Sequence, residues 1–398
     1  MVQWRDAAVQ SRGDRAAGPV KRQARLAPLG FFRAVWYCDG HDAQDAAMKI
    51  LVTGGAGFIG SAVVRRLVTV DTCSVVNLDA LTYAGRLDSL ASVAGSPGYA
   101  FEHADIRDAP VVADIFRRHQ PDAVLHLAAE SHVDRSIDRP GDFVTTNLVG
   151  TYTMLEAAVR YRDALPAGRR DGFRFLHVST DEVYGDLADG APADERAPYR
   201  PNSPYAATKA GSDHLARAWH RTYGLPVIIT NCCNNYGPYQ FPEKLIPTMI
   251  LAGLHGEPLP VYGEGLNVRD WLHVDDHAAA LSLILRNGRP GETYNVTAQT
   301  ERRNIDVVKA ICAALDDFRP DASCRPHEQL IHFVADRPGH DVRYALDGGK
   351  LSHELKWRPR VVFEGGLRET VRWYIENRAW WEPIRHAGHT GQRQGAAR

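Results

Sequence analysis

From residue 48 to about residue 235, short aliphatic runs alternate with longer amphipathic runs. The short runs are rich in Val, Ile and Leu and are bounded by Gly, Asp or Pro, which is typical of buried strands. The longer runs place apolar residues three and four positions apart, which predicts helices with one buried face. The expected strands are residues 49–54, 74–79, 99–105, 122–129, 173–180 and 226–233, and the expected helices are residues 58–68, 108–119, 142–161 and 203–224.

This alternation predicts an α/β protein: a doubly wound parallel sheet of the Rossmann-like type, with helices on both faces, over residues 48–235. After residue 235 the strand signal thins, and loops containing Pro and Gly join fewer helices. We expect residues 236–381 to form a smaller C-terminal lobe over the carboxyl edge of the sheet, with some segments returning to the main sheet. We expect residues 1–47 to be a disordered extension, with Met48 as an alternative initiator, and residues 382–398 to be a disordered tail.

Composition changes this picture mainly by exclusion. The 398 residues are 44% hydrophobic and 24% charged, with a formal net charge of -1, so no basic surface for nucleic acid or anionic lipid is expected. No apolar run approaches the roughly 20 residues of a membrane-spanning helix. The six cysteines show no CxxC pair and no zinc-ligand spacing, so we expect free thiols, no bound metal and a cytoplasmic setting.

A glycine-rich turn follows the first expected strand. Gly54, Gly57 and Gly60 lie between that strand and the next helix, where glycines let backbone N–H groups approach a pyrophosphate. The second strand ends in Asp79, whose carboxylate can bind the adenosine ribose 2′-hydroxyl and would repel a 2′-phosphate. The turn therefore predicts a site for NAD rather than NADP. Further strand ends should line the same crevice: Asp105, Ile106, Leu127, Ala128 and Ala129.

Tyr205 and Lys209 lie four residues apart in an expected helix. At this spacing they share one helix face, where the ammonium can lower the pKa of the phenol and hold the nicotinamide ribose. The phenolate would then accept a hydroxyl proton as hydride leaves for NAD. The alternative is an exposed helical pair without function.

The stretch "STDEVYGD" brings Thr180, Asp181 and Glu182 to the carboxyl end of another expected strand. Two adjacent carboxyl groups can divide labour when one is protonated and the other ionised. An acid and a base together could eliminate water from a sugar. The alternative is an acidic pair that caps a turn or faces solvent.

With these residues in view, the chain resembles the extended short-chain dehydrogenase/reductase (SDR) superfamily and, within it, the dTDP-glucose 4,6-dehydratase family. The likeness runs from Met48 to about Trp380. It differs at Cys233, where a serine is expected, at Ala207 and Thr208 near the tyrosine, and in the loop before Asn304, which lacks an expected glycine pair. The motifs that carry it are "TGGAGFIG", "LDALTYAG", "LAAESHVDRSI", "STDEVYGD", "SPYAATKA", "NCCNNYGPYQFPEKLIP", "RDWLHVDDH" and "DRPGHDVRYALD".

The resemblance implies NAD as cofactor, dTDP-glucose as substrate and a homodimer formed by the helices at residues 142–161 and 203–224. The implied catalytic residues are Thr180, Asp181, Glu182, Tyr205 and Lys209. The implied NAD-binding residues are Gly54, Gly57, Phe58, Ile59, Gly60, Asp79, Ala80, Leu81, Thr82, Asp105, Ile106, Leu127, Ala128, Ala129, Thr146, Tyr205, Lys209 and Asn235. The implied substrate-binding residues are Ser131, Thr180, Asn234, Lys244, Leu245, Pro260, Val261, Tyr262, Arg269, Asn304, Asp336, Arg337, Pro338, Gly339 and His340.

In the implied reaction, Tyr205 takes the proton of the sugar 4-hydroxyl, with Thr180 beside it. Glu182 removes the C5 hydrogen, Asp181 protonates the departing 6-hydroxyl, and hydride returns from the cofactor to C6. A nucleotide-sugar 4-epimerase is the nearest alternative, since it needs the tyrosine and NAD but not the two carboxyl groups. A catalytically silent NAD-binding module is the alternative from another class.

Overall fold

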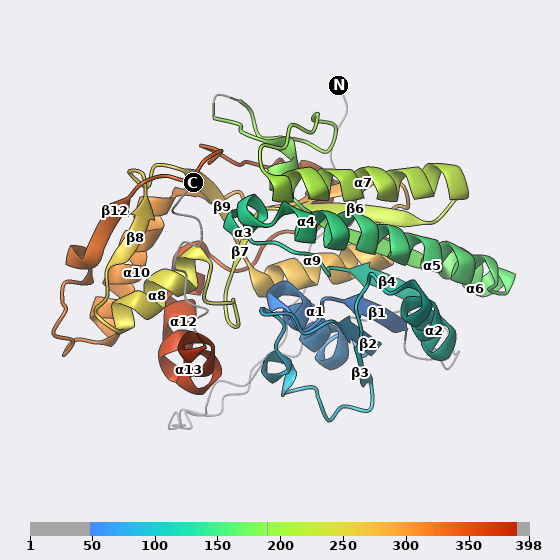
Figure 1. The fold of residues 1–398 in the computed structure, drawn as a ribbon, viewed down its shortest axis with the longest axis horizontal. Helices are drawn as coiled ribbons and strands as arrows, with labels where there is room; N and C mark the ends of the chain where they lie inside the picture. The colour runs from blue at the N-terminus through green and yellow to red at the C-terminus, as the bar shows by residue number, and fades with distance from the viewer. Residues whose placement is uncertain (1–47, 189, 388–398) are drawn as a thin grey trace, which may run out of the picture. The chain divides into compact units, whose positions relative to one another are not determined.

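The computed structural model describes residues 48–188 and 190–387 (Figure 1). The expected N-terminal extension, residues 1–47, lies outside this description, as do the residues after 387.

Seven parallel strands form the main sheet, in the order β10-β6-β5-β4-β1-β2-β3. The strand order reverses between β1 and β4, and ligands bind beyond the carboxyl ends of strands at such a switch point. The predicted doubly wound parallel sheet is therefore confirmed. The strands are β1 (Lys49–Thr53), β2 (Ser74–Asp79), β3 (Tyr99–His103), β4 (Ala123–His126), β5 (Arg174–Thr180), β6 (Val227–Cys232) and β10 (Thr293–Val296).

Helices cover both faces of this sheet (Figure 1). On one face lie α1 (Phe58–Thr69) and α9 (Val274–Asn287), which pack against each other. On the other lie α2 (Ala109–His119), α5 (Thr151–Asp163) and α7 (Pro204–Tyr223). The described chain also contains these shorter helices: α3 (Val133–Asp138), α4 (Pro140–Phe143), α6 (Ala167–Gly172), α11 (Gly349–Leu355), η1 (Leu87–Leu90), η3 (Asp181–Tyr184) and η4 (His327–Leu330).

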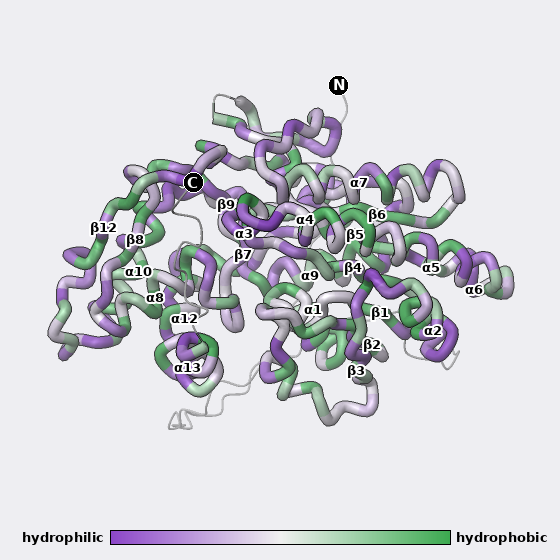
Figure 2. Tube along the Cα trace, in the orientation of Figure 1, coloured by the Kyte–Doolittle hydropathy of each residue, from purple (hydrophilic) through white to green (hydrophobic). Residues whose placement is uncertain are grey.

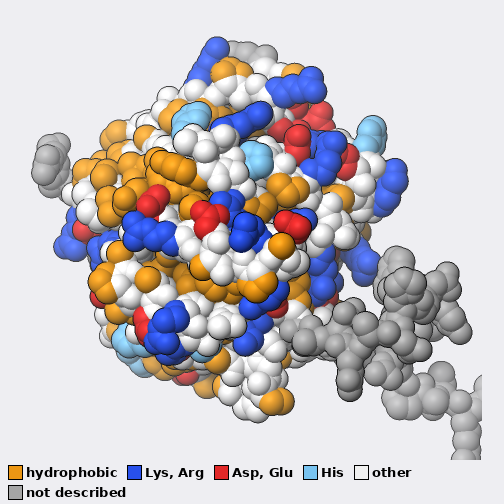
Figure 3. Space-filling view, turned by 90° about the vertical axis from the view of Figure 1, so that its right-hand side faces the viewer, with side chains coloured by type: hydrophobic (Ala, Val, Ile, Leu, Met, Phe, Trp, Pro, Cys, Tyr) orange, Lys and Arg blue, Asp and Glu red, His pale blue; other side chains and the backbone are white. Residues whose placement is uncertain are grey.

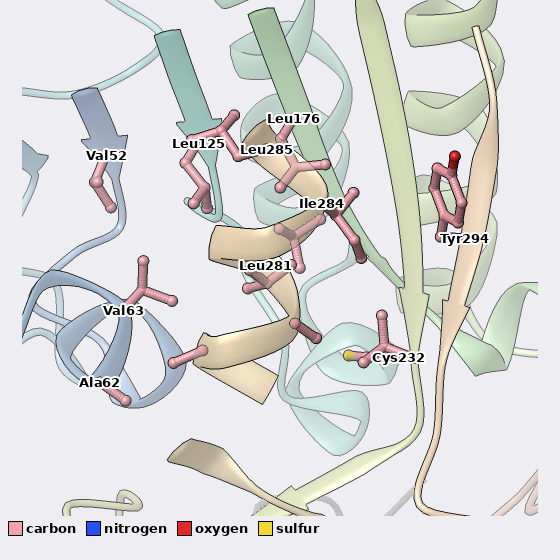
Figure 4. Close-up of a cluster of buried hydrophobic side chains, with 14 of the residues drawn as sticks. Val52, Ala62, Val63, Leu125, Leu176, Cys232, Leu281, Ile284, Leu285 and Tyr294 are labelled. Atoms are coloured by element: carbon pink, nitrogen blue, oxygen red, sulfur yellow. The ribbon is translucent and has the colours of Figure 1, made fainter. Parts of the chain in front are cut away.

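Alternate residues of each strand enter different cores, which explains the continuous aliphatic runs in the sequence. In β1, Ile50 and Val52 face the core shared with α1 and α9, whereas Leu51 faces the core shared with α2 and α5. Strand β6 begins with a hydrophobic run of three aliphatic residues (Figure 2). Figure 4 shows the first of these cores, formed by Val52, Ala62, Val63, Leu125, Leu176, Cys232, Leu281, Ile284, Leu285 and Tyr294.

The C-terminal lobe has its own core, in which Trp381 and Tyr374 are buried. One segment of this half of the chain, β10, returns to the edge of the main sheet beside β6. The elements of the lobe are α8 (Leu245–Leu254), α10 (Asn304–Phe318), α12 (Phe363–Glu376), α13 (Arg378–His386), the sheet of β7 (Asn234–Tyr236), β9 (Val268–His273) and β11 (Glu301–Arg303), and the pair β8 (Leu259–Tyr262) and β12 (Ile331–Val334).

Two expected elements differ from the structure. The disordered tail was expected from residue 382, but helix α13 continues to His386, because Ile384 packs into the core of the lobe beside Trp381. The helix expected over residues 142–161 is interrupted by a π-helical segment, η2 (Val144–Gly150). Asn147 within it is buried and hydrogen-bonds outward, to the backbone of Glu130 and to Thr208.

Candidate active site

The glycine-rich turn joins β1 to α1 at the switch point of the sheet. Gly54 has φ +71°, and a Cβ there would come within 2.7 Å of the backbone nitrogen of Ala128. A Cβ on Gly60 would overlap the carbonyl oxygen of Gly54. A Cβ on Gly57, by contrast, would have one neighbour among the described residues, the carbonyl oxygen of Gly54, at 3.3 Å. Two glycines thus allow close packing of the turn, while the third leaves open space in front of it.

The N-terminus of α1 faces this open space. Its N-cap is Gly57, and no side chain caps the helix. The first N–H groups of a helix need acceptors, and their partial positive charge favours an anion. Phe58 and Ile59 therefore present backbone donors suited to a pyrophosphate.

Asp79 closes the turn from the neighbouring strand. Its carboxylate accepts hydrogen bonds from the backbone N–H groups of Ala56, at 2.9 Å, and Leu81, at 2.8 Å. Burial raises the pKa of Asp79, and the two backbone donors oppose this shift. Each oxygen keeps a lone pair that a ribose hydroxyl could use, and ribose binding by Asp79 stays a prediction.

The next strand ends lie beside the same turn. Ala128 donates its backbone N–H to the hydroxyl of Thr53, at 3.2 Å. Ile106 is buried near Gly150 of the π-helical segment, which also contains Thr146. The carboxylate of Asp105 pairs with Arg107, at 2.6 Å, so its charge is already partly neutralised.

Tyr205 and Lys209 lie in the first turns of α7, where Lys209 is buried and Tyr205 is partly buried. The side chain of Thr180 is among the groups that affect the pKa of the Tyr205 phenol, so the two side chains are neighbours. The ammonium of Lys209 donates to the carbonyl of Val178, at 2.8 Å. Burial raises the pKa of Tyr205 well above its ordinary value, and the neighbouring Glu182 raises it further. The expectation that Lys209 lowers this pKa stays a prediction, because the net upward shift comes mainly from desolvation and does not measure the effect of the ammonium.

Lys209 lies above a second buried charge. Asp213, one turn further along α7, accepts hydrogen bonds from Ser179 and Tyr199, each at 2.9 Å, and lies 3.2 Å from His177. Burial lowers the pKa of Lys209, and the negative charge of Asp213 opposes that shift. Sequence reasoning missed Asp213, although its spacing of four residues from Lys209 was visible.

Asp181 and Glu182 follow β5 in the short helix η3. Burial raises the pKa of Asp181 to about 8, with a further contribution from the charge of Glu182. Oδ1 of Asp181 accepts from the Thr180 hydroxyl, at 3.2 Å, whereas no described residue hydrogen-bonds to its Oδ2. A pKa of about 8 favours the protonated form of Asp181 at neutral pH, in which it can act as an acid. The division of labour between the two carboxyl groups stays a prediction, because the pKa of Glu182 is raised as well.

Glu182 faces the cavity and the cations around it. Burial raises its pKa, and the charges of Arg337, Arg269 and Lys244 oppose that shift. Its Oε2 is buried and has no hydrogen-bond partner among the described residues. A carboxylate with a free oxygen and three nearby cations can stay ionised and serve as a base.

A cavity of about 520 Å³ lies between the sheet and the C-terminal lobe. It contains most of the predicted substrate-binding residues, which come from both halves of the chain. Thr180, Asp336, Pro338 and Gly339 are not part of its lining, and the hydroxyl of Thr180 instead donates to Asp181. The predicted residues that line it are Ser131, Asn234, Lys244, Leu245, Pro260, Val261, Tyr262, Arg269, Asn304, Arg337 and His340.

Arg269 was expected to offer its guanidinium to a diphosphate. In the structure it is 4% exposed, and its two terminal nitrogens donate to the carbonyls of Val268, Asp341 and Val342. Its plane also lies over the ring of Tyr344, 4.3 Å from the ring centre. Much of its hydrogen-bonding capacity is thus used within the protein, and Arg337 and Lys244 also supply positive charge to the cavity.

The lining of the cavity also includes residues that were not predicted from the sequence. The hydroxyl of Tyr83 donates to Glu243, at 3.0 Å, and the guanidinium of Arg135 lies 3.6 Å from the centre of the Tyr83 ring. Asp134 pairs with Arg337, at 3.2 Å. Arg337 was predicted, and the other four residues lie inside motifs already recognised, so their proximity in sequence to predicted residues was the available signal.

The described residues contain neither a candidate metal site nor a candidate membrane-spanning helix. Across residues 48–188 and 190–387, no three His, Cys, Asp or Glu side chains are grouped to hold a metal ion. Within the same residues, no helix combines the length and apolar character needed to cross a membrane.

Comparison with known proteins identifies relatives of the whole described region. Residues 51–370 match the family described as GDP-mannose 4,6 dehydratase. The chain is 55% identical over 360 residues to a dTDP-glucose 4,6-dehydratase of Escherichia coli, an alignment that covers 87% of this chain and 99% of the relative. It is 58% identical over 348 residues to a probable dTDP-glucose 4,6-dehydratase of Sinorhizobium fredii, covering 87% and 99%. The chain belongs to the dTDP-glucose 4,6-dehydratase family.

Solved structures agree with this assignment. A dTDP-glucose 4,6-dehydratase from Streptomyces venezuelae, with NAD and dTDP bound, is 50% identical, with a TM-score of 0.77 and coverage of 85% of this chain and 100% of the other. A UDP-glucose 4-epimerase from Thermus thermophilus in complex with NAD shares the fold at 31% identity, with a TM-score of 0.72 and coverage of 83% and 100%. The dehydratase family and the epimerases thus share one extended SDR architecture, and the higher identity is to the dehydratase.

Proposed function

We propose that this chain is an NAD-dependent hydro-lyase that converts dTDP-glucose to dTDP-4-dehydro-6-deoxy-glucose. The observation that carries the proposal is the pair Asp181 and Glu182 beside Tyr205. One carboxyl group is neutral at physiological pH, and the other faces the cavity amid three cations. Elimination of water across C5 and C6 needs a base that removes the C5 hydrogen and an acid that protonates the 6-hydroxyl. Epimerisation at C4 needs the tyrosine but no such pair at C5 and C6.

The residues at the switch point fit a dinucleotide. The uncapped N-terminus of α1 would hold the pyrophosphate, and Asp79 would hold the adenosine ribose. Ala80, Leu81 and Thr82, together with the ends of β3 and β4, would line the adenosine half. Lys209 would hold the nicotinamide ribose, with Asn235 and Thr146 nearby. NAD, when bound there, accepts a hydride from C4 of the sugar and supplies it to C6.

The chain's own residues perform the proton transfers. Tyr205 takes the proton of the 4-hydroxyl, and Thr180, whose side chain lies near the phenol, would orient that hydroxyl. Because a ketone at C4 acidifies the neighbouring C5–H, the carboxylate of Glu182 can remove that hydrogen. Asp181 gives its proton to the 6-hydroxyl, which leaves as water. Burial of these groups keeps solvent away from the reactive intermediate.

The nucleotide diphosphate would occupy the cationic part of the cavity. Lys244 and Arg337 supply positive charge there, and Ser131 and Asn234, which also line the cavity, would face the sugar. Tyr262 lines the same cavity, and its hydroxyl donates to Asp134, at 3.1 Å. The base would lie along β8, against Pro260 and Val261, near Asn304 and the segment 336–340.

We also propose a homodimer that uses α5 and α7. Four large apolar side chains on η2, α5 and α7 are between 43% and 50% exposed: Val144, Val149, Tyr152 and Tyr223. Hydrophobic side chains gather at the left of Figure 3, on the side of the molecule where α5 and α7 end. Covering this surface with a second copy would remove apolar area from water. The free thiols of the described cysteines fit a reducing compartment, and we propose the cytoplasm.

An isotope experiment tests the reaction. Incubation with dTDP-glucose carrying deuterium at C4 should give a product with the label in its C6 methyl group. A mixture of labelled and unlabelled substrate should show little exchange of label between molecules, because one bound cofactor serves both transfers. Label that stays at C4 would indicate an epimerase, and no reaction at all would indicate a silent NAD-binding module. Either result would overturn the proposal.

A further inference from the structure

A second group of reactive side chains lies outside the cavity, at the far end of α10. Cys324 is in the loop that follows α10, His327 begins η4, and Asp316 lies in the last turn of α10. None of the three lines the cavity of about 520 Å³. The reaction proposed above makes no use of them.

The three side chains form a chain of hydrogen bonds. Sγ of Cys324 lies 3.4 Å from Nε2 of His327, and Nδ1 of the same ring lies 2.6 Å from Oδ1 of Asp316. The backbone N–H of His327 also donates to that oxygen, at 3.2 Å. The imidazole is 1% exposed, so its orientation is fixed by packing as well as by these bonds.

The carboxylate decides which ring nitrogen carries the proton. Burial favours the neutral form of Asp316, but the hydrogen bonds from His327 prevail and lower its pKa. Arg325 adds a positive charge 3.5 Å from the same oxygen. An ionised carboxylate only accepts hydrogen bonds, so Nδ1 must donate, and Nε2 of the neutral ring presents its lone pair to the thiol.

A nucleophile, a base and a group that orients the base are thus aligned in order, the arrangement that activates cysteine in unrelated enzymes. A metal site is not the better explanation, since no grouping of this kind among the described residues is arranged to hold an ion. We propose that Cys324 is an activated thiol, with His327 as its base and Asp316 as the orienting carboxylate, and that it is a site of covalent modification by small soft electrophiles.

The size of the electrophile follows from exposure. Cys324 is partly buried, and its Cβ and Sγ lie near Gly256, beyond the end of α8. With iodoacetamide, the thiol proton passes to Nε2 of His327, the sulfur forms a bond to the methylene carbon, the carbon–iodine bond breaks and iodide leaves. An uncharged reagent suits the site, because the nearby charge of Arg325 is already paired with Asp316.

The test is the rate at which iodoacetamide alkylates each cysteine of the full-length protein, followed by mass spectrometry of peptides. An ordinary thiol has a pKa near 8.5, so only a few per cent is thiolate at about pH 7. Cys324 should instead react at near-maximal rate down to about pH 6.5. Replacing His327 with Gln, or Asp316 with Asn, should slow alkylation at that pH roughly 10-fold or more.

Cys312 is the internal control. It lies on α10 only one turn before Asp316, but burial raises its pKa to about 12. It should stay unmodified in the native protein and react only after unfolding. Peptide mapping also separates Cys324 from Cys38, which lies outside the described residues.

Two outcomes would overturn the proposal. In the wild-type protein, a rate for Cys324 that rises with pH about a midpoint near 8.5 would show a thiol that is merely hydrogen-bonded. Equal rates in wild type and in Asp316→Asn, with equal melting temperatures, would show that the carboxylate orients nothing. The pH profile of the wild-type protein decides the question even where His327→Gln fails to fold.

Discussion

Replacing Asp181 with Asn should change how protein stability depends on pH. Burial and the neighbouring Glu182 raise the pKa of Asp181 from 3.8 to about 8. Between these two values the folded state keeps a proton that the unfolded state has lost. The contribution of Asp181 to the free energy of unfolding of the wild type therefore falls by about 1.4 kcal/mol for each pH unit as the pH rises.

Asparagine does not titrate, so this loss is absent in the variant. The free energy of unfolding of Asp181→Asn, minus that of the wild type, should grow by about 3 kcal/mol between pH 5 and pH 7. The new amide places an N–H group where Asp181 has an oxygen without a hydrogen-bond partner, which changes the free energy of unfolding by a fixed amount. This amount is the same at each pH, so it does not affect how the difference between variant and wild type changes with pH. The same variant should lose most of its turnover, because it has no proton to give to the leaving hydroxyl.

Urea unfolding of the cofactor-free protein, followed by circular dichroism at about pH 5, 6, 7 and 8, measures the slope. A difference that stays constant with pH would refute the reasoning, since it would mean that Asp181 is already ionised in the folded state. Glu182→Gln is the matched control. It removes the second cause of the raised pKa, so the decline of stability with pH should end at a lower pH than in the wild type.

Three further predictions follow from the site. Tyr205→Phe should retain NAD but lose turnover by roughly 100-fold or more, and a rate near wild type would mean that another group takes the hydroxyl proton. Gly60→Ala should weaken NAD binding and lower the free energy of unfolding by about 1–3 kcal/mol, because the new Cβ would overlap a carbonyl oxygen. Gly95→Ala is the control: a Cβ at Gly95 would meet open space, so NAD affinity measured by calorimetry and the melting temperature should both stay unchanged. Asp213→Asn should lower the pKa of Lys209 and reduce turnover roughly 10-fold, visible as a shifted pH–rate profile; an unchanged profile would contradict this.

The glycine turn and the sheet were predictable because their signals are local. The spacing of Gly54, Gly57 and Gly60 and the acid at the end of the second strand lie within 26 residues of chain, and the aliphatic runs mark strands buried on both faces. The return of one later segment to the sheet was anticipated, but β10 itself was not identified, because four residues of mixed polarity are too short a pattern to indicate a strand.

The electrostatics of the site could not be predicted in the same way. The sign of the pKa shift of Tyr205 depends on how completely residues from β5, β6 and α7 exclude water from it. The carbonyls that occupy Arg269 come partly from residues 341 and 342, more than 70 positions along the chain. Such contacts are set by tertiary packing, which neither residue spacing nor periodicity reports.

The place of β10 at the edge of the main sheet bears on how this protein could be divided. Its parallel pairing covers one side of β6, a strand whose six residues are all buried. A fragment ending near residue 240 would retain the whole glycine turn and both carboxyl groups of the proposed acid–base pair, yet it would leave that side of β6 open. An exposed apolar edge strand pairs readily with other chains. Such a fragment should aggregate or exchange strands between molecules. We therefore expect that residues 48–240 cannot be transferred to another protein as an independent folding unit.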